Sequence, residues 1–142
     1  MKLIDNRTGL EVLDRDECMR LLGLAGIGRV AVVDGGQPMI FPVNYVVDSE
    51  QVLFRTGKGS KLESAVRHRP VVFEIDHSDP MYHTGWSVIV AGHAHEVTDP
   101  ERLAAIDLLP LRPWAAGDKD HVVAIPTERV TGRRIVHLNI QI

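Results

Sequence analysis

The sequence predicts a mainly β protein in which six or seven antiparallel strands and a few short helices form a closed or split β-barrel. Short runs rich in valine and isoleucine recur along the chain, each of a length typical of a strand. Tight turn signals join the first three runs, which makes a meander rather than a βαβ unit. The 142 residues fit a single domain that spans 1–142.

The composition is that of an ordinary globular protein, and it narrows the class of function. The apolar fraction is 44% and the charged fraction 25%, a balance that supports a folded core. The net charge of −3 argues against a general nucleic-acid binder, which usually carries a basic excess. The N-terminal residues form no apolar run of signal-peptide length, and no stretch approaches a membrane span. We therefore expect a cytoplasmic protein that binds neither nucleic acid nor membrane.

The N-terminal residues 1–13 are expected to form an irregular or extended arm, followed by a helix at about 15–25. Asp14 is the predicted N-cap of this helix, and Glu17, three residues later, is the partner of a capping box. Cys18 follows on the apolar side of the helix. Because a single cysteine forms no internal disulfide, we interpret Cys18 as a core residue.

The meander that follows contains two prolines in its second strand. Pro38 and Pro42 each lack an N–H donor, so we expect that strand to be irregular. The hairpin turn before it is Asp34-Gly35-Gly36. The three predicted strands of the meander are 29–33, 37–47 and 51–56.

The rest of the chain adds two short helices and four strands. Ser60 caps a helix that runs to about Arg67. Asp99-Pro100-Glu101 starts another that runs to about Ile106, because aspartate caps, proline fits the first turn and glutamate meets the positive end of the helix dipole. The strand predicted at 86–97 is long enough to bend around a barrel. The predicted strands are 71–75, 86–97, 122–125 and 129–138.

The loop between the third strand and the second helix is the best candidate for a binding site. It passes Gly57 and Gly59, which let backbone N–H groups approach an anion, and it enters a helix N-terminus with partial positive charge. We interpret this loop as an anion site, with a solvated basic turn as the alternative from the local sequence. Its cations and hydroxyls are Arg55, Thr56, Lys58, Ser60 and Lys61.

The order of these features resembles the pyridoxamine-5′-phosphate-oxidase-like flavoprotein family. The strand end Phe54-Arg55-Thr56-Gly57 is followed by Gly59-Ser60-Lys61 at a helix start and by Arg69-Pro70-Val71-Val72-Phe73 on the next strand. The later segments Gly85-Trp86-Ser87-Val88 and Pro113-Trp114-Ala115 are similar to small actinobacterial-type members. The resemblance covers the chain from Asp14 to Leu138.

The resemblance implies a split barrel that binds FMN, or in some branches the deazaflavin F420, in a cleft at a homodimer interface. One strand segment would lie along the isoalloxazine ring, and the loop would meet the ribityl chain and the phosphate. Trp86 would face the flavin from the partner subunit and Trp114 would reach the same cleft, with packing as the alternative for both. The implied cofactor-binding residues are Met39, Ile40, Phe41, Pro42, Val43, Phe54, Arg55, Thr56, Lys58, Ser60, Lys61, Trp86 and Trp114.

The implied function is that of an FMN-dependent oxidoreductase with a small-molecule substrate. Lys61-Leu62 stands where the vitamin-B6 oxidases of the family carry an Arg-Lys pair, so oxidation of vitamin B6 itself is not expected. The alternatives are an F420-binding oxidoreductase, a non-catalytic flavin or F420 carrier, and a haem- or metal-binding split barrel. The last would use His93 and His95, whose imidazoles are about 7 Å apart on one strand face. A metal site needs three or four ligands, so this pair is weak evidence.

Overall fold

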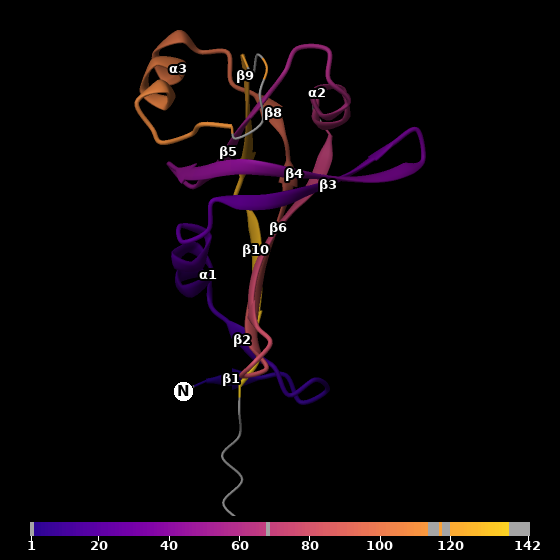
Figure 1. Ribbon diagram of the computed structural model, residues 1–142, viewed down its shortest axis with the longest axis vertical. Coiled ribbons are helices and arrows are strands. Elements are labelled where there is room, and N and C mark those ends of the chain that lie inside the picture. Colours follow the sequence, from indigo (N-terminus) through magenta and orange to yellow (C-terminus); the bar gives the residue numbers. More distant parts are fainter. Residues whose placement is uncertain (1, 68, 114–116, 118–119, 137–142) are drawn as a thin grey trace, which may run out of the picture.

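The computed structural model describes residues 2–67, 69–113, 117 and 120–136, and it confirms a mainly β fold. Ten strands and three short helices occur within these residues (Figure 1). None of these helices has the length and apolarity that a membrane crossing requires. The elements in chain order are β1 (Leu3–Ile4), β2 (Glu11–Leu13), α1 (Arg15–Leu22), β3 (Ile27–Asp34), β4 (Gln37–Asp48), β5 (Gln51–Thr56), α2 (Lys61–Val66), β6 (Pro70–Asp79), β7 (Thr84–His93), β8 (His95–Glu96), α3 (Pro100–Asp107), β9 (His121–Pro126) and β10 (Arg129–Arg134).

The strands form one antiparallel sheet in the order β1-β2-β10-β7-β6-β3-β4-β5-β9-β8, which is open at β1 and β8. The sheet is nevertheless curled, because one stretch of chain pairs in two places. β7 lies between β10 and β6, and the chain then passes Ala94 into β8, which pairs with β9. At this bend a Cβ on Gly92 would lie only 2.8 Å from the carbonyl oxygen of Pro126, so the close approach requires glycine. The result is a split barrel.

The described residues contain more strands than the six or seven expected. The N-terminal arm, predicted to be irregular or extended, is extended in part: β1 and β2 pair with each other, and β2 extends the sheet beside β10. The strand predicted at 86–97 divides at Ala94, where its hydrogen-bonding partners change. The first helix ends three residues earlier than predicted, since Gly23 caps it by donating its N–H to the carbonyl of Arg20. The three helices and the other strands begin within two residues of their predicted starts. β6 runs four residues beyond its predicted end, and β10 ends at Arg134; residues 137–138 of the predicted last strand lie outside the described residues.

The strand β4 is regular through both prolines, contrary to the expectation of an irregular strand. Its register against β3 is unbroken. The two-residue turn Gly35-Gly36 fixes which residues of β4 direct their backbone nitrogens toward β3. Pro38 and Pro42 occupy the alternate positions, so their backbone nitrogens point away from β3. On that side β5 pairs only with residues 45–48 of β4. The prolines therefore lie along an open edge, where no ladder hydrogen bond is lost.

Two apolar clusters lie on opposite faces of β5 and β9. The main cluster lies inside the curled sheet, is covered by α1 and α2, and includes the fully buried Cys18, as predicted. The second cluster lies under α3, which two ion pairs hold in place: Arg102 with Asp48 at 2.7 Å and Arg55 with Asp107 at 2.9 Å. The members of the second cluster are Leu53, Ile106, Leu111, Val122 and Ala124.

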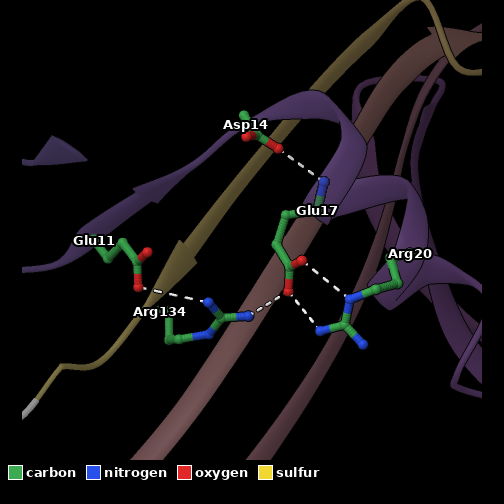
Figure 2. Close-up of polar contacts among 5 residues, drawn as sticks. All are labelled: Glu11, Asp14, Glu17, Arg20 and Arg134. Atoms are coloured by element: carbon green, nitrogen blue, oxygen red, sulfur yellow. Dashed lines mark hydrogen bonds and ion pairs between the residues drawn. The ribbon is translucent and has the colours of Figure 1, made fainter. Parts of the chain in front are cut away.

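The helix α1 is fastened to the sheet through Arg134 of β10, which lies between two carboxylates (Figure 2). Its guanidinium is 3.5 Å from the carboxylate of Glu11 on β2 and donates to the carboxylate of Glu17 on α1. Arg20 donates to both oxygens of Glu17, and Asp14 accepts the N–H of Glu17 at 2.8 Å, the cap predicted from the sequence. The hydrogen bonds from Arg20 and then Arg134 lower the pKa of Glu17 to about 2.

Acid should weaken the fold through Glu17. Because its pKa is lowered on folding, its contribution is fully present above the unfolded value of 4.5 and is lost as the pH falls toward about 2. Glu17→Gln should lower the stability at neutral pH and reduce the further loss between about pH 5 and pH 2. Urea unfolding across this range measures both effects. Glu101→Gln, in the first turn of α3, is the control, and an acid-induced loss as steep in Glu17→Gln as in the native chain would contradict the assignment.

Candidate functional site

Two neighbouring hollows lie beside residues that the sequence analysis selected. The first, called the sheet-face hollow here, has a volume of about 600 Å³ and lies over β3, β4, β6 and β7. Its lining is mainly apolar, with His93, Glu128 and Arg129 at its polar edge. The apolar lining includes Ala31, Val33, Pro38, Met39, Ile40, Pro70 and Val72.

The second, called the loop hollow, has a volume of about 500 Å³ and lies at the start of α2. Gly59 adopts a φ of +74°, a conformation that favours glycine and lets the chain turn from β5 into the helix. Ser60 then caps α2 as predicted, because its Oγ accepts the N–H of Glu63 at 3.0 Å. The lining residues are Gly59, Ser60, Glu63, Ser64, Arg67 and Arg69.

Arg69 joins the two hollows. It lines the loop hollow, and the next residue, Pro70, lines the sheet-face hollow. Its guanidinium donates to the Asp34 carboxylate at 2.8 Å and lies 3.5 Å from the carbonyl oxygen of Val33, itself part of the sheet-face hollow. A mainly apolar surface therefore adjoins a surface of arginine and serine side chains.

Glu63 brings a negative charge into the loop hollow. Its carboxylate accepts the N–H of Gly59 and a guanidinium N–H of Arg67 at 3.2 Å, and it lies 3.7 Å from Nδ1 of His121. The Gly59 hydrogen bond, ahead of the charges of His121 and Arg67, lowers the pKa of Glu63 although burial opposes this shift. Glu63 is thus ionised at neutral pH, and the chain itself occupies one N–H of the predicted anion loop.

His121 and Thr56 lie at facing ends of β9 and β5. Nδ1 of His121 also contacts the carboxylate of Glu96 on β8, and the two residues line a small hollow beside α2. The strand register pairs His121 with Thr56. Thr56 is 2% exposed, and its hydroxyl has no hydrogen-bond partner among the described residues. An unsatisfied buried hydroxyl therefore lies directly before the loop.

The five residues of β4 predicted to contact a flavin ring divide between the two faces of the strand. Met39 and Ile40 line the sheet-face hollow, and Ile40 is 67% exposed. Pro42 is exposed two residues further along the face of Ile40, whereas Met39, Phe41 and Val43 share the other face, which packs in the main core. The structure thus brings Met39 and Ile40 into the hollow and leaves the other three outside its lining.

The side chains of Phe54 and Arg55 lie away from the loop hollow. Phe54 is fully buried in the main core. Arg55 points to the opposite face of β5, where it donates to Asp107 at 2.9 Å and to the carbonyl of Leu111 at 3.3 Å. Successive side chains of a strand face opposite sides, and α3 covers the side of Arg55.

The remaining predicted residues are distributed as follows. Lys58 and Lys61 are exposed next to Ser60, and within the described part of the chain neither belongs to an ion pair. Trp86 lines another hollow, of about 440 Å³, where its ring lies 6.2 Å from that of His77. Trp114 lies outside the described residues.

Three residues of the loop hollow were not predicted from the sequence: Glu63, Arg67 and Arg69. A signal was present for each. Glu63 stands three residues after Ser60, which is the capping-box spacing already used for Asp14 and Glu17. The two arginines lie between the end of the helix and the strand that starts at Pro70, and so lie close to the predicted anion loop in the fold.

The two histidines considered for metal binding are placed differently. His93 lines the sheet-face hollow, whereas His95 lies on β8 opposite Ala124. Over the described ranges, no group of three or more histidine, cysteine, aspartate or glutamate side chains is arranged to hold a metal ion.

The lack of a hydrogen-bond partner for the Thr56 hydroxyl predicts how the free energy of unfolding changes when this hydroxyl is removed. Thr56→Val should leave the free energy of unfolding unchanged or raise it by up to about 1 kcal/mol, because it removes a buried group that lacks a partner. Thr127→Val is the matched control: Thr127 is 3% exposed, donates to the carbonyl of Glu50 at 2.8 Å and accepts from Arg15 at 3.1 Å. It should lose about 1–2 kcal/mol. Equal losses in urea unfolding of the two variants would show that Thr56 is satisfied in solution.

Comparisons with known proteins identify the family and the fold of the chain. The sequence profile described as pyridoxamine 5′-phosphate oxidase matches residues 14–134. The chain is 46% identical over 129 residues to the uncharacterized protein Rv0080 of Mycobacterium tuberculosis, covering 87% of this chain and 84% of that one. The solved structure of the FAD binding protein from Mycobacterium smegmatis is similar, with a TM-score of 0.77, 38% identity and coverage of 89% of this chain and 98% of that chain.

A second solved structure, a conserved protein of unknown function from Corynebacterium diphtheriae, has a TM-score of 0.75 and 33% identity. It too covers 89% of this chain and 98% of its own. These matches confirm the family resemblance drawn from the loop and from the order of strands around it. The chain belongs to the pyridoxamine 5′-phosphate oxidase family.

Proposed function

We propose that this chain binds a flavin nucleotide and acts as a flavin-dependent oxidoreductase on a small molecule. The ring would occupy the sheet-face hollow and the phosphate the loop hollow. The observation that carries the proposal is that the two hollows adjoin at Arg69 and Pro70. One is mainly apolar, and the other is lined by two arginines, two serines and the carboxylate of Glu63. A flavin nucleotide joins a planar ring to an anionic phosphate, which matches this pairing.

The residues of the two hollows fit such a molecule. A bound flavin supplies the hydride or electron transfer, and the protein supplies binding, orientation and electrostatics. Met39 and Ile40 would contact the ring. The phosphate would be held by Ser60, Arg67 and Arg69, with Lys58 and Lys61 beside them.

Which of FMN, FAD and F420 binds depends on the phosphate end of the molecule. The sequence favours FMN, with F420 as the alternative, and the relative from Mycobacterium smegmatis is a FAD binding protein. Titration of the ligand-free protein with riboflavin, FMN, FAD and F420 tests the proposal. At least one phosphate-bearing form should bind more tightly than riboflavin. Binding of none of them, or equal binding of all four, would contradict it.

Loss of the arginines of the loop hollow should weaken nucleotide binding selectively. Arg67→Gln and Arg69→Gln should each cost about 1–2 kcal/mol of FMN or FAD affinity, the low end for charge-assisted hydrogen bonds because both side chains are partly exposed. Riboflavin, which lacks the phosphate, should bind unchanged. The control is Arg7→Gln, a charge change on an N-terminal side chain that is 89% exposed. Fluorescence titration measures all three ligands, and unchanged nucleotide affinity in both variants would refute the phosphate assignment.

We further propose that the chain is a homodimer with the cofactor at its interface. Four large apolar side chains stand exposed on the outward face of β3, β4, β6 and β7, which is the face of the sheet-face hollow. The strand register sets Ile40 and Val72 on either side of Ala31. A contiguous apolar surface of this kind is typical of a self-association interface. Its residues are Val33, Ile40, Val72 and Ile89.

A charge placed on this face should prevent association. Ile89 is 41% exposed and lines neither hollow, so Ile89→Arg would place a charge in the dimer interface without touching the proposed cofactor residues. Its neighbour in the register, Glu74, is already paired with Arg29 at 3.1 Å, so the burial of this charge would be costly. Light scattering should give a dimer mass for the native chain and a monomer mass for this variant. Leu108→Arg is the control, because Leu108 is 89% exposed at the end of α3 and should leave the dimer intact. A monomeric native chain would contradict the proposal.

A further inference from the structure

The outward face of the sheet carries two carboxylates that share one guanidinium. Arg29 of β3 lies 3.1 Å from the carboxylate of Glu74 and 3.4 Å from that of Asp76, both on β6. Burial, followed by the neighbouring Asp76, raises the pKa of Glu74, and Arg29 offsets this shift only in part. Asp76 is the more distant and the more exposed carboxylate, at 45% against 31% for Glu74. Among the described residues, the negative charge of Asp76 is therefore only partly compensated.

The opposite charge lies two strands away, on β10. Arg129 and Arg133 stand on the outward face of this strand, on either side of Thr131. Within the described ranges neither arginine belongs to an ion pair, and Arg133 donates to the carbonyl of its own neighbour Gly132 at 3.0 Å. Adjacent strands are about 4.8 Å apart, so β6 and β10 are separated by about 10 Å.

The strand β7 separates the acidic and the basic parts of this face. The register places Glu74 and Thr131 on either side of Ile89, and Asp76 and Arg133 on either side of Ser87. Directly paired residues share one face of a sheet, so these side chains belong to the same outward surface as the exposed Ile89. A negative region on β6 and a positive region on β10 thus flank the outward side chains of β7.

This separation of charge suits a second copy of the chain. In a two-fold contact, each surface meets the same surface of its partner, so residue i contacts j while j contacts i. A region of one sign centred on the axis would repel itself, whereas regions of opposite sign on either side of the axis attract each other twice. An axis over β7 brings β6 of each copy against β10 of the other, and Ile89 against its own copy.

We propose that two copies of the chain associate through ion pairs between Asp76 of each copy and an outward arginine of β10, Arg129 or Arg133, of the other, about a two-fold axis over Ile89. The inference rests on the homodimer of the proposed function and adds the residues that orient the two copies. Glu74 keeps Arg29, and Asp76 receives a guanidinium that the fold of a single chain does not supply.

Charge reversal on the two strands tests the pairing. In a dimer of Asp76→Arg, arginine faces arginine at both contacts, so the dissociation constant should rise at least about tenfold. Arg129→Asp or Arg133→Asp, whichever residue faces Asp76, should weaken its own dimer in the same way. An equal mixture of Asp76→Arg and that β10 variant should form a heterodimer, because both contacts then join opposite charges. Sedimentation velocity measures association, and native mass spectrometry measures the composition of the dimers.

Two further variants keep the test decisive. Arg7→Asp is the matched control for net charge, because it makes the same change as the β10 variants on an N-terminal side chain that is 89% exposed. It should remain a homodimer and should not draw Asp76→Arg into a heterodimer. Asp76→Asn removes the charge at nearly constant volume and serves if the reversal unfolds the chain. It should raise the dissociation constant at least about threefold.

The outcomes separate the pairing from the homodimer on which it rests. If Asp76→Arg forms a heterodimer with neither β10 variant, or forms one as readily with Arg7→Asp, the pairing is overturned while the homodimer stands. Native affinity in Asp76→Asn would overturn it as well. If the native chain is a monomer, the pairing and the homodimer fall together.

Discussion

The stretch Thr84–Glu96 has to satisfy hydrogen-bond ladders in two places, and the rest of the structure depends on this. Its first part, β7, is bonded on both edges, to β6 and β10, and its continuation, β8, is bonded to β9. A flat sheet cannot meet both demands, so the sheet curls until Gly92 lies against the carbonyl of Pro126. The curl creates an inner face for the main core and an outer face that remains partly uncovered.

The curled sheet is covered on both faces in one part and on its inner face alone in another. β5 and β9 are buried on both sides, inside by the main core and outside by α3, which forms ion pairs through Arg102 and with Arg55. Within the part of the chain that the structure describes, no helix covers the outside of β3, β4, β6 and β7, and there the apolar side chains Ile40 and Val72 stand exposed. The uncovered face carries one hollow, and the turn into α2 carries the other. The proposed cofactor site and the proposed dimer interface therefore follow from the same feature of the fold.

The sequence predicted the parts of this arrangement that depend on local chemistry. β-branched runs marked the strands, and the caps at Asp14, Ser60 and Asp99 marked all three helices, each confirmed by a hydrogen bond to the N–H three residues later. The regularity of β4 was not predicted, because the effect of Pro38 and Pro42 depends on which edge of the strand has a neighbour. That information comes only from the pairing of the whole sheet.

The location of the site was predictable from the sequence, but several of the residues that line it were not. Gly59 and Ser60 were selected on local grounds and line the loop hollow. Arg55 was selected for its charge, but strand alternation and the cover of α3 turn it to the other face. Arg69 was not selected, because its place between the hollows depends on the contact of β6 with the β3–β4 hairpin at Asp34.

The measurement that tests the account most directly is a crystal structure of the protein with a bound flavin nucleotide. The account predicts the isoalloxazine ring against Met39 and Ile40, in the sheet-face hollow, and a phosphate within hydrogen-bond distance of Arg67 or Arg69. A flavin bound with its ring elsewhere, or with its phosphate at Arg55 beneath α3, would contradict the assignment of the two hollows.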